Sequence, residues 1–190
     1  MNEVQLIRNQ LALERAHANA VANACATALQ ADGGSTSGSD SWAPFRRACV
    51  DYLACVVAWF EERDQRLTDL LQARAGATHP AQRALEEVLA RAGRSREALA
   101  KLEAACGDVG ASSFRDRQKA WREFAEYFNG VWSTRRDALD TLLAANSRPA
   151  DWRTLGGIDA DSILEERRRY ALVAAQAPPG VTLGATADRA

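Results

Sequence analysis

The chain has no excess charge of either sign and no long apolar run. Its 190 residues carry 24 Lys and Arg against 25 Asp and Glu, a formal net charge of −1. The broad electrostatic attraction that drives binding to nucleic acids or anionic membranes is therefore missing, and we expect neither partner. No apolar segment approaches the roughly 20 residues that cross a bilayer, and residues 1–10 are polar, unlike a secretion signal. The sequence predicts a cytoplasmic protein.

Histidine and paired cysteine motifs are also scarce. The two histidines are His17 and His79, and the second lies beside a proline in a predicted turn. The four cysteines show no C-x-x-C spacing and fall in apolar helical patterns: Cys25, Cys49, Cys55 and Cys106. We interpret them as reduced core residues, with a redox or ligand role as the alternative.

The composition that remains fits one bacterial domain. A chain of this length can bury a core of its own, and two domains are not required. Lysine occurs only at positions 101 and 119, the other basic residues are arginines, and alanine is abundant. These biases are typical of a GC-rich bacterial genome. We expect a single helical domain over residues 1–176.

Apolar residues recur at alternating spacings of three and four along most of the chain, as in amphipathic helices. A Gly- and Ser-rich stretch at 31–43 predicts a flexible linker, and the Pro-Pro-Gly run after residue 177 predicts a disordered tail at 177–190. The expected fold is all-α: an antiparallel up-down-up-down four-helix bundle with a short additional C-terminal helix. The predicted helices span about residues 2–30, 44–74, 80–107, 113–146 and 162–176.

Local polar patterns refine this picture. Ser113 with Asp116, and Ser162 with Glu165, have the spacing of residues that cap the start of a helix. Two mixed-charge runs, at 61–64 and 165–169, are typical of solvated helix faces with short-range ion pairs. We therefore do not assign them a site.

Three charged residues interrupt apolar stripes at similar depth. Glu14, Arg63 and Arg135 each lie 11 or 12 residues from one end of a predicted helix, or roughly 17 Å at 1.5 Å per residue. In an up-down-up-down bundle those ends meet on one side, so the sequence predicts a buried polar layer in which the charges pair. The alternative is that helix rotation carries them to the surface, where arginine covers apolar neighbours.

His17 lies one turn after Glu14 and belongs to the same candidate layer. The pair could act as a general acid and base, in a pocket lined by aromatic residues such as Trp59, Phe60 and Trp132. No Ser or Cys lies in a nucleophile motif, however, and no Gly-rich phosphate loop is present. An enzyme is therefore the less favoured class.

Some four-helix bundles hold two metal ions near their middle through carboxylate ligands. The residues of the candidate layer can be compared with such a site. Ferritin-like sites need Glu-x-x-His from two helices. Here residues 14–17 form the only such pair, and the chain has no third histidine. A complete di-iron site of this kind is not expected.

The arrangement resembles the hemerythrin-like bundles over about residues 4–152. Residues 13–17 look like the first-helix segment that carries a histidine ligand in that family. Residues 59–63 are similar to its His-Phe-x-x-Glu segment, and residues 139–152 to the end of its fourth helix with the acidic-Trp pair that follows. The resemblance implies an iron- or dioxygen-binding bundle.

The ligands of that family are mostly lost here. Trp59 stands in place of a histidine and Arg63 in place of the glutamate, while Val131 and Arg136 replace the histidine and aspartate of the fourth helix. Only His17 remains, and arginine stays protonated and cannot bind a metal.

We therefore expect a non-catalytic interaction or ligand-binding module with no cofactor and no metal, acting on an unknown protein or small molecule and forming a homodimer. The alternative is a hemerythrin-like iron or dioxygen binder with atypical ligands.

Overall fold

The computed structural model describes residues 3–31, 42–75, 79–107, 113–144, 148–156 and 160–183. Over these ranges the protein forms six helices and no strand, which confirms the all-α prediction. No helix in the described part of the chain is both long enough and apolar enough to cross a membrane.

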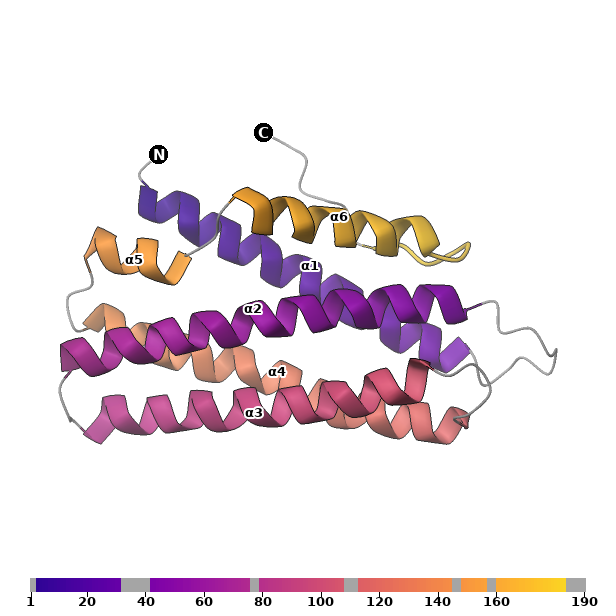
Figure 1. Ribbon diagram of the computed structural model, residues 1–190, viewed down its shortest axis with the longest axis horizontal. Coiled ribbons are helices and arrows are strands. Elements are labelled where there is room, and N and C mark those ends of the chain that lie inside the picture. Colours follow the sequence, from indigo (N-terminus) through magenta and orange to yellow (C-terminus); the bar gives the residue numbers. More distant parts are fainter. Residues whose placement is uncertain are drawn as a thin grey trace.

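Four long helices make up most of the molecule. They lie alongside one another along its longest axis (Figure 1). Each packs on the next in the chain, and the first also contacts the fourth. Most of the linker predicted at 31–43 lies outside the described residues. The four helices are α1 (Glu3–Ala31), α2 (Ala43–Ala75), α3 (His79–Gly107) and α4 (Phe114–Ala144).

The start of α4 follows the predicted capping pattern. The backbone N–H of Ser113 donates to Asp116 Oδ2 (3.2 Å), and the backbone N–H of Asp116 donates to Ser113 Oγ (3.2 Å). The two contacts satisfy N–H groups that have no partner within the helix, so the chain enters a helix at Phe114.

The start of α6 (Ala160–Gln176) differs from the prediction. The helix begins two residues before Ser162, so this serine lies inside the first turn and is not the residue that caps it. Glu165 instead accepts a hydrogen bond from Arg169 Nε one turn later (2.6 Å). Spacing alone therefore placed the helix start incorrectly.

A short helix absent from the prediction, α5 (Pro149–Gly156), precedes α6. Pro149 fits a first helical position because its missing N–H has no intrahelical partner there. The carboxylate of Asp151 accepts the backbone N–H of Arg148 (2.6 Å) and so caps the helix. Eight residues contain too few apolar positions for a periodicity to be recognised.

Among the residues whose side chains the structure describes, the buried apolar ones form two clusters. The larger joins α1 from Ala18 to Leu29, α2 from Phe45 to Phe60, and parts of α3, α4 and α6. The smaller consists of Leu67, Val88, Trp152 and Leu155, against which Val4, Ile7 and Leu70 pack. Helix α5 supplies two of its members, so its place in the fold is to cover one end of the long helices.

The first residues of the predicted disordered tail, 177–183, contain a turn and pack on the larger cluster. Val181 N–H donates to Pro178 O (3.1 Å), with Pro179 and Gly180 at the central positions. Gly180 has φ +90°, which glycine adopts without strain, and Pro-Gly is the pair that such a turn prefers. Val181 and Leu183 then pack against the larger cluster. Residues 184–190 of the predicted tail lie outside the described residues.

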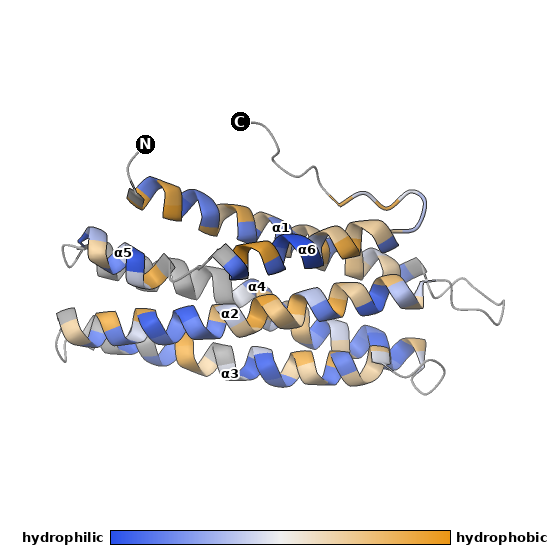
Figure 2. Ribbon diagram, turned by 45° about the horizontal axis from the view of Figure 1, so that its top comes forward, coloured by the Kyte–Doolittle hydropathy of each residue, from blue (hydrophilic) through white to orange (hydrophobic). Residues whose placement is uncertain are grey.

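Helix α6 lies against α2 and, less extensively, α1. Figure 2 shows that its middle is its most hydrophilic stretch, where residues 165–169 are Glu and Arg. One of these residues nevertheless points inward and forms the site described next.

Candidate functional site

The first buried polar contact joins α1 to α2. Glu14 is 2% exposed and Arg63 is 9% exposed, and both lie on the buried faces of their helices. The guanidinium donates from Nη1 to Glu14 Oε2 and from Nη2 to Oε1 (3.2 Å). Gln10 Nε2 adds a third hydrogen bond to Oε1 (3.2 Å). This two-pronged pairing offsets the cost of removing both charges from water.

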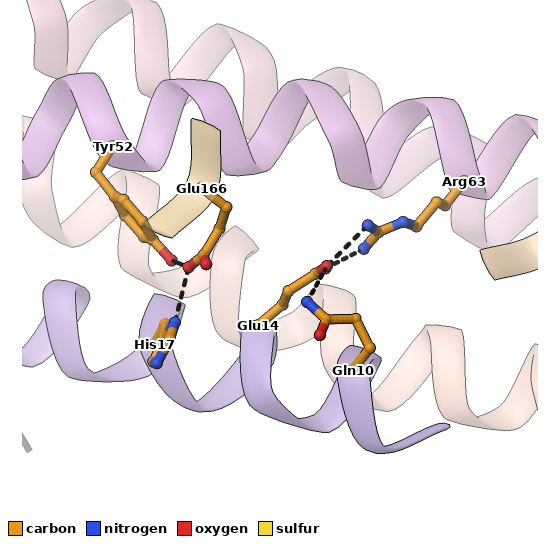
Figure 3. A network of polar contacts seen from close by, with 6 residues as sticks. All are labelled: Gln10, Glu14, His17, Tyr52, Arg63 and Glu166. Carbon is orange, nitrogen blue, oxygen red and sulfur yellow. Dashed lines mark hydrogen bonds and ion pairs between the residues drawn. The ribbon is translucent and has the colours of Figure 1, made fainter. Parts of the chain in front are cut away.

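The second buried contact attaches α6 to the same two helices (Figure 3). Glu166 is 1% exposed, and its Oε1 lies 2.6 Å from the hydroxyl of Tyr52 and 2.8 Å from Nδ1 of His17. Tyr52 comes from α2 and His17 from α1, so one carboxylate oxygen ties three helices together. Because a carboxylate only accepts hydrogen bonds, this geometry calls for a proton on Nδ1 of His17.

Tyr170 completes the site from α6. Its ring stacks on the imidazole of His17, with centroids 4.0 Å apart and planes at 18°, and it meets Tyr52 edge-on at 6.0 Å. His17 is only 7% exposed, and its Nε2 has no hydrogen-bond partner among the described residues. The imidazole is thus fixed on one edge and on one face.

The site raises the pKa of both tyrosines. Burial contributes most to the high pKa of Tyr52, and the neighbouring carboxylate of Glu166 adds to it by repelling a phenolate. The same two causes, in the same order, raise the pKa of Tyr170. Both phenols therefore stay protonated near neutral pH, and the hydroxyl of Tyr52 serves as a donor.

The structure gives the predicted layer residues different partners. Glu14 pairs with Arg63, whereas His17, one turn away on α1, pairs with Glu166. Phe60 lies in the larger apolar cluster and Trp59 is half-buried. Arg135 and Trp132 belong to the part of α4 whose side chains are outside the described residues, so their predicted places are untested.

Sequence reasoning missed Glu166, Tyr52 and Tyr170 as site residues. Glu166 belongs to a run interpreted as a solvated face, and so does Asp64, which is 3% exposed. The spacing of Glu166 from the apolar residues of its own helix could have identified it. Ile163, Glu166, Tyr170 and Val173 are spaced three, four and three apart, the same kind of interrupted stripe that singled out Glu14.

A separate groove of about 480 Å³ runs between α1 and the turn that follows α6. Alanines of α1 form part of it, together with the polar side chains of Asn19, Asn23 and Thr27, and residues 180–182 line the other side. Among the residues that the structure describes, no charged side chain lines this groove, although 26% of the chain is charged. Its chemistry is that of a neutral surface with amide and hydroxyl groups.

Among the residues that the structure describes, no group of three or more His, Cys, Asp or Glu side chains is arranged to hold a metal ion. Comparisons with protein-family models, with curated proteins and with solved structures give no match to this chain.

Proposed function

We propose that the protein is a non-catalytic helical module of the bacterial cytoplasm that binds a small ligand or a protein partner. In this proposal the four long helices form an antiparallel up-down-up-down bundle without a di-iron site. A hemerythrin-like ancestry would then be retained in the bundle, while the ligands of the metal site have been replaced.

The observation that carries the proposal is the pairing of the two glutamates in the candidate site, Glu14 and Glu166. Glu14 is bound by Arg63 and Gln10, and Glu166 by His17 and Tyr52. A carboxylate that is bound by a guanidinium is a poor metal ligand, since the cation already occupies its oxygens. These groups connect helices, which is a structural role and leaves binding to the surface.

The neutral groove beside α1 supports a ligand-binding role. Of the described residues, a ligand there would meet the amides of Asn19 and Asn23 and the hydroxyl of Thr27, and no charged side chain. We therefore propose an uncharged ligand that carries both hydrogen-bond donors and acceptors, because an amide side chain can accept from the donors and donate to the acceptors.

Two measurements test the proposal. Elemental analysis of the purified protein should find iron, manganese and zinc far below one per chain; near-stoichiometric metal would favour the hemerythrin-like alternative.

A thermal-shift screen of uncharged metabolites should find a stabilising ligand whose effect is lost in Asn23→Arg, which fills the groove, and retained in Ala104→Arg on the exposed face of α3. A screen in which both variants respond like the unaltered protein would contradict binding in this groove.

Self-association as a homodimer stays a prediction, which light scattering at several concentrations will test. Its expected outcome is a mass of about twice 20.6 kDa.

A further inference from the structure

The groove beside α1 is elongated, which bears on the kind of ligand it can take. Its wall on α1 runs from Ala16 to Thr27. This stretch of helix rises about 17 Å, which is the length of about five residues of extended chain. Spread over those five residues, the volume of about 480 Å³ leaves roughly 100 Å³ for each. That space fits one main-chain unit with a short side chain.

Three polar side chains follow one another along this wall: Asn19, Asn23 and Thr27. We call them the polar ladder. Each lies four residues after the previous one, so they share a side of the helix and are separated by about 6 Å along its axis. Groups that point to the same side of an extended peptide recur every second residue, or about 6.6 Å. The two repeats nearly match, so one straight peptide can meet successive members of the polar ladder.

The polar ladder supplies both hydrogen-bond donors and acceptors. The side-chain amide of each asparagine carries two N–H donors and a carbonyl acceptor. The hydroxyl of Thr27 already donates to the backbone oxygen of Asn23 (3.0 Å), so its lone pairs are left to accept from a ligand. A peptide main chain presents one donor and one acceptor per residue. The groups on the wall and those of a main chain are therefore complementary.

The other lining residues favour an uncharged peptide. The methyl groups of Ala16, Ala20 and Ala24 lie among the members of the polar ladder, and residues 180–182 line the facing side outside any helix. None of the described residues that line the groove is charged. A charged side chain would lose water in the groove without meeting an opposite charge, which is unfavourable.

Building on the proposed function, we infer that the ligand of this groove is an extended, uncharged peptide segment of about five residues, held through its main chain by the polar ladder. Because the hydrogen bonds go to main-chain groups, binding depends on the extended backbone and tolerates exchange among short uncharged side chains. A compact metabolite is too short to reach all three members of the polar ladder, whereas the peptide contacts each of them.

The test measures fluorescence anisotropy of the terminally blocked peptide Ala-Ser-Ala-Ser-Ala, labelled with an uncharged fluorophore, as full-length protein is added. We expect saturable binding with a Kd below about 1 mM. Asn19→Ala/Asn23→Ala should weaken binding at least about tenfold because two hydrogen-bonding amides are lost, while alanine favours the helix. Asn9→Ala is the matched control and should leave the Kd unchanged, since Asn9 is exposed on the same helix and does not line the groove.

A second probe tests recognition of the main chain. The same peptide with every main-chain nitrogen methylated keeps its side chains and lacks N–H donors, so it should bind at least about tenfold more weakly. Three results would each overturn the inference: equal binding of the two peptides, no binding of the unmethylated peptide up to about 1 mM, and binding that Asn19→Ala/Asn23→Ala leaves unchanged.

Failure of this inference can be told apart from failure of the proposed function. A metabolite that stabilises the protein but not Asn23→Arg, in the absence of peptide binding, would retain the proposed function and exclude the peptide. If neither a metabolite nor the peptide binds, both are contradicted. A mass in light scattering that halves in Asn23→Arg would place a second copy of the chain in the groove and would also overturn the inference.

Discussion

Arg63 and Glu14 illustrate how a single buried charge depends on its partner. Either residue alone would leave an ion inside the protein without compensation, which costs far more than the pair contributes to stability. The arginine lies between Phe60 and Leu67 along α2, both buried, and is itself only 9% exposed. Substitution of Arg63 should therefore lower the free energy of unfolding strongly.

We predict that Arg63→Ala lowers the free energy of unfolding by about 3–5 kcal/mol, because Glu14 is left buried without its cation. Urea denaturation followed by circular dichroism measures this. Arg66→Ala is the matched control, since Arg66 pairs with Glu62 in an exposed position on the same helix and should cost about 0.5 kcal/mol. A loss from Arg63→Ala as small as that of the control would show that the pair does not matter for stability.

The raised pKa of Tyr52 predicts a stability that falls in alkaline solution. In the folded protein this pKa lies above the value of about 10 that the unfolded chain has, so the contribution is full below pH 10. It is lost as the pH rises further, because the unfolded state then releases a proton that the folded state keeps. Urea midpoints measured across this range should fall with pH, less steeply in Tyr52→Phe; equal slopes in both proteins would refute the assignment. The pKa of Tyr170 is raised as well, so the urea midpoint of Tyr52→Phe should still fall with pH, but less steeply.

At the scale of elements, α6 depends on a polar contact in the middle of its buried face. Glu166 reaches both α1 and α2, whereas its neighbour Glu165 bonds to Arg169 within α6. Two adjacent glutamates therefore have different roles, one between helices and one along the helix.

We predict that Glu166→Ala speeds hydrogen exchange of the α6 amides at least about tenfold, equivalent to a loss of about 1.4 kcal/mol from local opening. Glu165→Ala should leave exchange of α6 within about twofold of the unaltered protein. Exchange followed by mass spectrometry resolves the helix by its peptides. Equal exchange in the two variants would mean that apolar packing by Tyr170 and Val173 alone holds α6.

The sequence predicted the long elements well because their periodicity continues over many turns. It missed α5, which has only eight residues, and placed the start of α6 two residues too late, at Ser162. The Glu14 and Arg63 positions were recognisable as breaks in long apolar stripes. The pairing of His17 with Glu166 was not, since the two residues are 149 positions apart and nothing local specifies their contact.

At the scale of the whole molecule, the Glu14–Arg63 pair lies between the two apolar clusters along both α1 and α2. On α1 the smaller cluster uses Val4 and Ile7, and the larger begins at Ala18. On α2 the larger reaches Phe60 and the smaller resumes at Leu67. The described part of the protein therefore has two apolar cores with a charged layer between them.

We predict that the two cores differ in local stability. Amides of α5 and of α1 before Gln10 should exchange faster than those of α1 from Ala18 to Leu29, because the smaller cluster buries much less apolar surface. Hydrogen exchange of the unaltered protein under native conditions tests this. Uniform protection along α1 would show that the charged layer does not divide the molecule.

The charged layer also limits how sequences of this fold can diverge. Within each core one aliphatic residue can replace another at small cost, so those positions are free to drift. Positions 14 and 63 cannot change one at a time, because each intermediate leaves an unpaired buried ion, whereas an apolar pair could replace both. Relatives of this protein should therefore carry either both charges or neither, and the ion pair would be inherited as a unit.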